Sequence, residues 1–309
     1  MPVLSPWRLR LLVQLESLGT IRAVAEALAM SPSSVSQQLS VLQQEARATL
    51  LEHHGRRVSL TPAGVRLAAH AREILRSIEA AEADLTSRRT EPVGDVRVAA
   101  FSSALRAVVL PVAAELRRSH PRLRLTVTEL EPHDGLRMLR RGEVDVAVVY
   151  DFADGWLPVD AQVRYVRLGS DPVVVVLPQG HPGASAEELE LGSMAGERWA
   201  MDRPACYLSE LVLRRCRQAG FEPEIAGHFG SYPLLLDQVR LGLAVAALPA
   251  LAVDERDGVV VRPLVPALTR IIHAALPVGP APTAAVDVVL AGLRAHGVTP
   301  TPRTPRLVR

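Results

Sequence analysis

A run of short polar residues between Ser31 and Gln44 has the composition of a helix that reads DNA. Val35, Leu39 and Leu42 recur at helical spacing and predict the inner face of that helix. The outward stripe then carries hydroxyl and amide groups, on Ser33, Gln37, Ser40 and Gln44, with Ser34, Ser36 and Gln38 beside it. A Gln amide pairs with N6 and N7 of adenine in the major groove, and Ser hydroxyls approach phosphates and base edges closely. A helix face that is merely exposed to solvent would have the same composition. The elements around this helix must therefore show whether it is positioned to read DNA.

Two shorter helices are predicted in front of it. Their apolar residues recur at helical spacing and are Leu11, Leu15, Leu18, Ile21, Val24, Ala25 and Leu28. Gly19-Thr20 ends the first helix and caps the second, and Ser31-Pro32 places a hydroxyl at the N-cap of the third, with proline at its first position. The N–H groups that Thr20 and Ser31 flank also suit a phosphate. This order of helices and breaks is typical of a helix-turn-helix motif.

Residues 55–61 (GRRVSLT) predict a short hairpin, or wing, after the third helix. Arg56 and Arg57 in this wing, and Arg22 at the start of the second helix, are candidate phosphate contacts, because neutralising phosphates supplies most non-specific affinity for DNA. Arginines that only confer solubility would be placed in the same way. The Gly-Arg-Arg turn beside the reading helix favours the DNA role.

A long helix is predicted from Thr61-Pro62 onward. Its apolar residues repeat in steps of four and three, which gives the period of about 3.5 residues of a coiled-coil seam. The seam residues are Leu67, Ala71, Ile74, Ile78, Ala81 and Leu85. They predict a dimerisation helix.

Beyond residue 91 the chain alternates strand-like and helical stretches. The strand-like stretches are DVRVAAF, LRLTVTELE, VDVAVVY, PVVVVLP and AVAALP, and the helical ones are ALRAVVLPVAAELRRSHP, DGLRMLRRGE, YLSELVLRRCRQAG and PLLLDQVRLGL. This alternation predicts a parallel α/β architecture.

Loops that follow the strands are the candidate ligand contacts, because open α/β sheets bind ligands beyond the carboxyl ends of their strands. Ser102-Ser103 opens a helix directly after a strand, and Tyr150-Asp151 ends another strand. The segments around Met201-Asp202-Arg203 and Gly230-Ser231-Tyr232 are the other two loops. The predicted contacts are Ser102, Ser103, Tyr150, Asp151, Arg203, Ser231 and Tyr232. Arg203 is the cation among these loops and would suit a carboxylate, although turns, caps and a surface ion pair would use the same residue types.

Composition agrees with a folded protein of more than one domain. Of 309 residues, 48% are apolar and 22% are charged, which excludes disorder along the whole chain. Every one of the 35 basic residues is Arg. The net charge of +2 is the sum over three segments whose charges differ. Residues 1–90 hold 11 Arg against 8 acidic residues, residues 91–296 hold 21 against 25, and residues 297–309 hold three Arg and no acid.

No stretch of about 18 apolar residues predicts a membrane span, and the N-terminus lacks an export signal. Two cysteines, Cys206 and Cys216, are too few for a disulfide scaffold. We therefore expect a cytoplasmic protein without membrane association. No catalytic motif, metal-ligand cluster or cofactor motif is present, so we expect no enzyme activity, no metal and no cofactor.

The run from Gly19 to Gly64 (GTIRAVAEALAMSPSSVSQQLSVLQQEARATLLEHHGRRVSLTPAG) resembles the winged helix-turn-helix of LysR-type transcriptional regulators. LPVAAELRRSHPRLRLTV, LRRGEVDVAVVY, VVVVLPQGHP and VRLGLAVAALP resemble, in order, the effector domain of the same family. The resemblance implies a multidomain α and α/β protein with a winged helix-turn-helix domain (1–62), a linker dimerisation helix (63–90) and a two-lobed effector domain (91–296) like a periplasmic binding protein. Residues 297–309 (GVTPTPRTPRLVR), with three Arg, three prolines and no acidic residue, predict a disordered tail. It also implies a homodimer or a dimer of dimers that bends promoter DNA in response to a small molecule, with RNA polymerase as a further candidate partner.

The chain departs from the family pattern in the reading helix and wing. Pro32 and Gln37 replace a usual Gln and Arg, Ala46-Arg47 replaces Leu-Gly, and 51–53 (LEH) replaces Phe-x-Arg. The operator sequence therefore does not carry over. His53 and His54 would bind phosphate only when protonated.

Three alternatives follow from other features. Cys206 and Cys216 are placed like the redox-active pair of peroxide-sensing members of the family, and neighbouring arginines favour a thiolate at Cys216. Incidental reduced thiols are the other interpretation, because ten residues of helix would separate the pair.

A solute-binding protein would share the architecture of residues 91–296, but such a protein needs an export signal and has no DNA-reading helix. An α/β enzyme would need a catalytic constellation.

Overall fold

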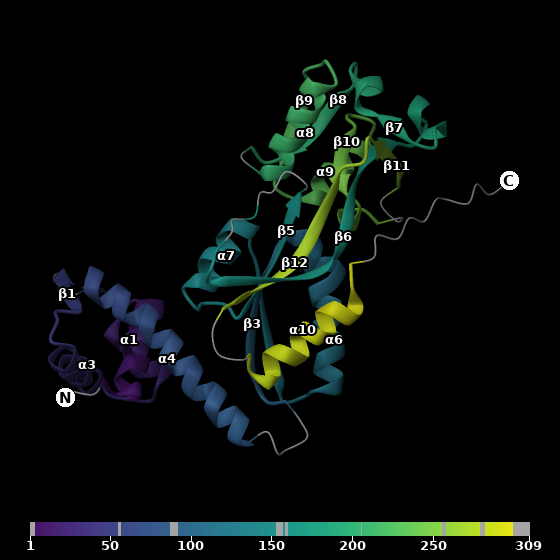
Figure 1. The fold of residues 1–309 in the computed structure, drawn as a ribbon. Helices are drawn as coiled ribbons and strands as arrows, with labels where there is room; N and C mark the ends of the chain where they lie inside the picture. The colour runs from purple at the N-terminus through teal and green to yellow at the C-terminus, as the bar shows by residue number, and fades with distance from the viewer. Residues whose placement is uncertain are drawn as a thin grey trace.

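The structure is a computed structural model that describes residues 4–54, 57–86, 92–152, 157, 160–204, 206–254, 258–278 and 282–298. The chain forms a helical domain, a long linker helix and a two-lobed α/β body (Figure 1).

The predicted helix-turn-helix is confirmed. Its helices are α1 (Pro6–Leu18), α2 (Ile21–Ala27) and α3 (Pro32–Ala46). Gly19 ends α1 with a φ of 74°, a left-handed conformation that glycine adopts without a Cβ penalty. The Thr20 hydroxyl accepts from the Ala23 N–H and the Ser31 hydroxyl accepts from the Ser34 N–H, each at 3.1 Å, so both predicted N-caps are in place. Val35, Leu39 and Leu42 are buried against leucines of α1.

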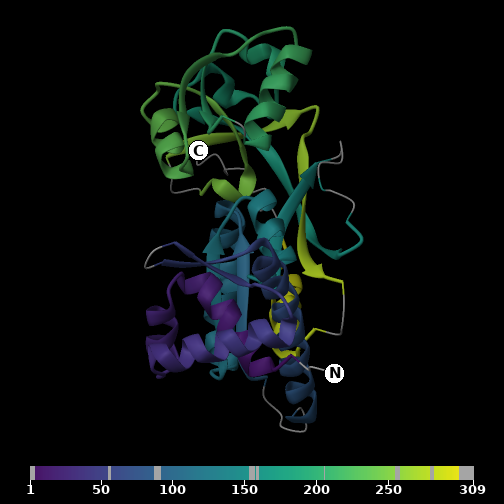
Figure 2. The same ribbon diagram turned by 90° about the vertical axis from the view of Figure 1, so that its left-hand side faces the viewer.

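The wing is an antiparallel hairpin of β1 (Leu51–His54) and β2 (Arg57–Leu60). Figure 2 shows it projecting from the helical domain. Gln43 ties the wing to α3, because its side-chain oxygen accepts from the backbone N–H groups of Leu50 and Leu51 at 2.9 and 3.1 Å. The wing therefore has a fixed position relative to α3.

The linker helix α4 (Pro62–Thr86) begins where the sequence predicts. The first turns of α4 pack against the helical domain of the same chain. Ala71 is fully buried in the core of that domain, and Leu67 packs against the same core. Farther along, Ile74 is 39% exposed, Ile78 is half-buried and Ala81 is exposed. The side chain of Leu85 lies outside the described residues. The predicted seam is thus divided between the chain's own core and a surface that remains open for a partner.

One lobe of the body, lobe I, is built on parallel strands. It contains β3 (Gly94–Ala100), β4 (Leu123–Glu129), β5 (Val146–Phe152), the helical stretch α5 (Ser102–Ala104), η1 (Leu105–Val109) and α6 (Leu110–Ser119), and the helices α7 (Pro132–Arg140) and α10 (Ala284–His296). Alternate residues of β3 face the two sides of the sheet, with Val98 toward α6 and Ala99 toward α7. Figure 1 shows α6 and α10 on one face and α7 on the other.

The other lobe, lobe II, is smaller. It contains β7 (Leu189–Glu190), β8 (Arg198–Asp202), β9 (Glu224–Phe229), β10 (Ala246–Pro249), β11 (Val259–Val265), α8 (Tyr207–Gln218) and α9 (Tyr232–Arg240). Two strands connect the lobes, β6 (Val163–Pro178) and β12 (Thr269–Pro277), which pair antiparallel and run side by side (Figure 1). The sheet is therefore mixed, because β12 runs antiparallel to both β5 and β6 where strand–helix alternation alone predicts parallel pairing.

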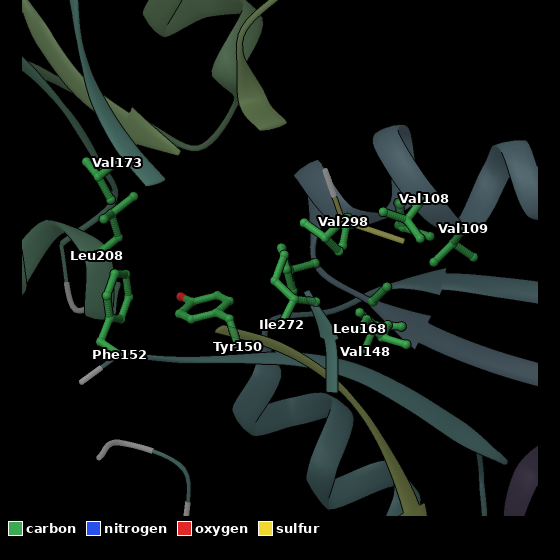
Figure 3. Packing of buried hydrophobic residues seen from close by; sticks show 14 of the residues in the cluster. Val108, Val109, Val148, Tyr150, Phe152, Leu168, Val173, Leu208, Ile272 and Val298 are labelled. Atoms are coloured by element: carbon green, nitrogen blue, oxygen red, sulfur yellow. The ribbon is translucent and has the colours of Figure 1, made fainter. Parts of the chain in front are cut away.

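A single apolar core continues from one lobe into the other. Phe152 at the end of β5 lies beside Leu208 of α8, and Val173 of β6 lies beside the same group (Figure 3). Val298 also belongs to this core and is 7% exposed, and its N–H donates to the Leu168 carbonyl at 3.3 Å. The packed body thus reaches residue 298, and residues 299–309 of the expected tail lie outside the described residues.

Candidate functional site

The outward face of α3 carries the residues that the sequence predicts for DNA reading. Ser33, Gln37, Ser40 and Gln44 are exposed, whereas Val35 and Leu42 on the opposite face are 0% exposed. Ser36 is exposed as well, and Gln38 is half-buried and accepts from the Arg8 guanidinium at 3.4 Å. The stripe therefore presents amide and hydroxyl groups to solvent, and Gln38 lies at its edge against α1.

The N-terminus of α3 gathers three hydroxyls. The Ser31 Oγ lies 2.9 Å from the Ser33 Oγ and 2.8 Å from the Ser34 Oγ. Hydroxyl groups and N–H groups at a helix N-terminus favour an anion such as a phosphate. Farther along α3, the Ser40 hydroxyl donates to the Ser36 carbonyl at 3.0 Å.

The other predicted DNA contacts divide into described and undescribed residues. Arg22 on α2 is exposed and forms an ion pair with Glu26 one turn along, at 3.0 Å, which is a weak interaction at a surface. Arg56 and the side chains of Arg57, His53 and His54 lie outside the described residues.

A polar cleft lies where the carboxyl ends of strands from both lobes meet. It is lined from lobe I by Phe101, Ser102, Glu129, Glu131 and Tyr150, from lobe II by Asp202, Arg203, Cys206, Gly230, Ser231 and Tyr232, and from the connecting strand β12 by Arg270. We call it the inter-lobe cleft. Its volume is about 420 Å³, which includes space open to solvent.

The cleft brings together most of the predicted effector residues. Ser102, Tyr150, Arg203, Ser231 and Tyr232 line it. Two predicted residues do not: Ser103 is buried beneath the cleft, and the Asp151 carboxylate accepts from the N–H groups of Phe152 and Leu157 at 2.9 and 3.1 Å. Asp151 alternates with its two aromatic neighbours along β5 and therefore faces the other side of the sheet.

Other lining residues are absent from the predicted set. Glu129 ends β4 and Glu131 follows it by two residues. Both therefore lie at a strand end, where open α/β sheets bind ligands, and the sequence could have predicted them. The sequence suggests only redox chemistry for Cys206, whereas the structure places it at the N-cap of α8 and in the lining of the cleft. Arg270 lies within β12, and no local sequence pattern identifies it as a residue of the cleft.

Arg270 is held in a buried polar network at the base of the cleft. Its guanidinium donates to the Asp171 carboxylate of β6 at 2.7 and 2.9 Å and to the Ser103 hydroxyl at 2.6 Å. The Leu251 N–H donates to the same carboxylate at 3.1 Å. Arg270 also stacks over the rings of Phe101 and Tyr150, 4.7 and 5.1 Å from their centroids. The network links the two connecting strands to lobe I.

Burial sets the protonation of the groups around the cleft. Burial, then the neighbouring Asp202 carboxylate, raises the pKa of Glu131, and burial raises the pKa of Asp202 as well. The phenols of Tyr150 and Tyr232 have pKa values raised by burial, so both hydroxyls stay protonated and can donate hydrogen bonds.

Both thiols are held in the protonated form. Burial, then the carboxylates of Glu131 and Asp202, raises the pKa of Cys206 to about 12. Burial raises the pKa of Cys216 to about 11, and this thiol is 0% exposed. The arginines beside Cys216 in the sequence therefore do not create the thiolate that they suggested. Cys206 caps α8 and Cys216 lies within it, so ten residues of helix, about 15 Å, separate them.

Among the described residues, no group of three His, Cys, Asp or Glu side chains is arranged to hold a metal ion. Within the same part of the chain, no helix combines the length and apolar character needed to cross a membrane.

The comparisons with known proteins agree with this arrangement of domains. Residues 7–65 match the family model of the bacterial regulatory helix-turn-helix protein, lysR family, and residues 89–297 match that of the LysR substrate binding domain. The hydrogen peroxide-inducible genes activator of Pectobacterium carotovorum subsp. carotovorum is 27% identical over 255 residues, which cover 81% of this chain and 82% of that protein. A probable hydrogen peroxide-inducible genes activator of Mycobacterium avium is 29% identical over 249 residues, 79% and 78% of the two chains.

Solved structures show the same fold. A variant of full-length OxyR from Pseudomonas aeruginosa superposes with a TM-score of 0.77 at 22% identity, covering 94% of this chain and 98% of that one. Full-length CbnR in complex with its target DNA gives a TM-score of 0.61 at 18% identity, covering 95% and 100%. With both family models matched in order along its length, the chain belongs to the LysR family of bacterial transcriptional regulators and carries that family's effector-binding domain behind its helix-turn-helix domain.

Proposed function

We propose that this regulator binds and bends promoter DNA as a dimer or dimer of dimers, and that a small molecule in the inter-lobe cleft modulates this binding. The observation that carries the proposal is the exposed Ser and Gln stripe of α3, held by two intact N-caps and tied to the wing through Gln43. An ordinary surface helix would not require these caps or a fixed contact with the wing. The solved complex of CbnR with its target DNA, which shares the fold, supports the same role for the helical domain here.

On DNA, α3 enters the major groove with Gln37 toward the bases. Ser33, Ser34, Ser36, Gln38 and Ser40 complete the reading surface, and Thr20, Arg22, Ser31, Arg56 and Arg57 contact the phosphates. The linker helices of a dimer fix the separation of two such readers and hence the spacing of the half-sites.

The cleft supplies the second part of the mechanism. Its residues come from both lobes and from the connecting strand β12, so a ligand that contacts all three favours one degree of lobe closure. In the same chain, the Arg72 guanidinium of α4 forms an ion pair with Glu16 of α1 and donates to the Arg141 carbonyl of lobe I at 2.9 Å. Lobe movement can therefore reach the DNA-binding domain through the linker helix.

A thiol-based response to peroxide is the second candidate, favoured by the names of the relatives and by the place of Cys206 in the cleft. We rank this candidate second because both thiols are protonated and about ten residues of helix separate them. The names of the relatives, which are transcriptional regulators, also support a protein without enzyme activity. Binding to chromosomal DNA implies that the protein is located in the cytoplasm. RNA polymerase remains a candidate partner.

A gel-retardation experiment tests the proposal. The purified protein is titrated onto DNA from upstream of its own gene and onto random DNA at several salt concentrations. We expect retardation with preference for the upstream DNA, and the absence of retardation at low salt would contradict the proposal.

Two variants separate reading from phosphate contact. Gln37→Ala should lower affinity for the specific site by about 10-fold or more and leave random DNA unaffected, because one bidentate base contact is worth about 1–3 kcal/mol. Arg22→Ala should weaken both and lower the slope of log K against log salt by about one. Arg117→Ala, the same charge change on an exposed residue of α6, is the control and should change neither. Equal effects of Gln37→Ala on both DNAs would contradict its role as a reader.

A further inference from the structure

The charge of the inter-lobe cleft indicates the chemistry of its ligand, an inference that rests on the proposed effector role of the cleft. The carboxylates of Glu129, Glu131 and Asp202 line it, together with the guanidinium groups of Arg203 and Arg270. Arg270 is already neutralised by buried Asp171 at 2.7 Å. Within the described part of the chain, Arg203 is then the remaining lining cation, and it faces three carboxylates. The cleft has an excess of negative charge.

Glu131 lines the cleft from lobe I. It is half-buried at the N-cap position of α7, but its side chain caps no backbone N–H there. Its carboxylate receives no hydrogen bond from any residue that the structure describes. A poorly solvated carboxylate without donors costs free energy, as its raised pKa also indicates, so a donor from outside the chain would stabilise it.

Asp202 presents a second carboxylate from the opposite lobe. It accepts from the Arg203 N–H at 2.7 Å and is hydrogen-bonded by the Cys206 thiol and the Tyr232 hydroxyl, so its position is fixed. Glu131 belongs to lobe I and Asp202 to lobe II, and the Asp202 charge acts on Glu131 across the cleft. Two like charges on facing lobes oppose closure, and a cation between them would favour it.

The remaining lining residues select the type of cation. The rings of Phe101, Tyr150 and Tyr232 line the cleft, and Arg270 stacks over the first two. No metal-binding cluster of three ligands occurs among the described residues, which favours an organic cation over a metal ion.

We propose that the inter-lobe cleft binds a small molecule with a protonated amine, which sits between Glu131 of lobe I and Asp202 of lobe II and draws the lobes together. The Arg203 side chain, exposed at the rim over Gly230, offers a place for an acidic group on the same molecule. Amino acids and simple amines are thus the two sources of this chemistry.

Thermal-shift titration of the full-length protein tests the proposal. One panel contains simple amines (putrescine, agmatine, spermidine), a second contains amino acids (lysine, arginine, ornithine, glutamate), and a third contains carboxylates without an amine (succinate, citrate, benzoate). We expect saturable stabilisation from the first or second panel, and which one responds identifies the role of Arg203. Glu131→Gln should weaken that binding by about 10- to 100-fold, because it removes a charge-assisted hydrogen bond. Glu115→Gln on the exposed face of α6 should leave it unchanged.

The same variants check that the effect comes from the cleft. Without added compound, Glu131→Gln should melt at the same or a higher temperature than the parent at pH 7.5, since it removes an unpartnered carboxylate. A lower melting temperature would show that Glu131 has a structural partner and would overturn the proposal. Stabilisation by amine-free carboxylates that survives Glu131→Gln, or none from any amine-bearing compound, would also overturn it. Retardation of promoter DNA in the gel assay would support the proposed function whether or not the thermal-shift experiment supports an amine ligand.

Discussion

At the scale of single residues, Arg47 shows how the departures from the family pattern affect stability. It ends α3 with φ 50° and ψ 38°, a left-handed conformation at the place where the resemblance implies Gly. A side chain at such a position costs about 1 kcal/mol relative to glycine.

Arg47→Gly should therefore raise the free energy of unfolding by about 1 kcal/mol, measured by urea denaturation. Arg66→Gly, the same change on an exposed residue within α4, should lower it by about 1 kcal/mol, because glycine is a poor helix former. Destabilisation by Arg47→Gly would show that its side chain makes a contact that outweighs the backbone strain.

The Cys206 thiol makes the two candidate responses distinguishable. With a pKa of about 12, set by burial and by the carboxylates of Glu131 and Asp202, only about one molecule in 10⁵ carries the thiolate at pH 7. In a Cys216→Ser background, alkylation of Cys206 by iodoacetamide should be slow at pH 7 and accelerate about tenfold per pH unit up to pH 10. Glu131→Gln should accelerate it at every pH, because removing a negative charge lowers the pKa of the thiol. A rate that levels off between pH 7 and 8 would instead favour the peroxide response.

At the scale of elements, α4 consists of a buried stretch followed by an exposed one. Its first turns complete the core of the helical domain through Ala68 and Ala71, and its middle exposes Ile74 and part of Ile78. The 3.5-residue period describes both stretches equally, but only the second is open to a partner. Leu67 and Ala71 thus support folding of the monomer. We propose that dimerisation uses the exposed part of the seam, at Ile74, Ile78 and Ala81.

Ile74→Asp should weaken dimerisation by about 100-fold or more, since it would bury an unpaired charge in the helix pair. Analytical ultracentrifugation measures the change. Ser77→Asp, an exposed position on α4, carries the same new charge and should leave the mass of the assembly unaltered. An Ile74→Asp protein that sediments like the parent would place the dimer interface elsewhere.

At the scale of the whole molecule, the lobes depend on a buried ion pair between the strands that join them. Arg270 of β12 and Asp171 of β6 are 1% and 0% exposed, and Ser103 of lobe I completes the network. Arg270→Met should lower the free energy of unfolding by about 3–5 kcal/mol, because Asp171 would remain buried without its partner.

The double variant Asp171→Asn with Arg270→Met should recover part of that loss, since an amide can still accept from the Leu251 N–H. Chemical denaturation of the full-length protein gives both values. A double variant less stable than Arg270→Met would mean that the Asp171 charge has another partner in the folded state.

Local sequence determined the elements and much of the candidate site. The caps at Thr20 and Ser31, the buried stripe of α3 and the strand ends that carry Tyr150 and Arg203 all depend on residues within a few positions of one another. Periodicity and capping are properties of such short segments, so the sequence expresses them directly.

Only the tertiary structure decided which of these residues act together. Arg270 and Asp171 are 99 positions apart, and Arg270 and Ser103 are 167 apart. Glu131 faces Asp202 because the β6 and β12 connection brings two lobes together, and Ala71 is buried because α4 folds back on α1. These contacts depend on how whole elements pack, which no local pattern encodes. The amide and hydroxyl face of α3, which we propose reads DNA, can therefore be predicted from the sequence, whereas the acidic character of the cleft is a property of the folded chain.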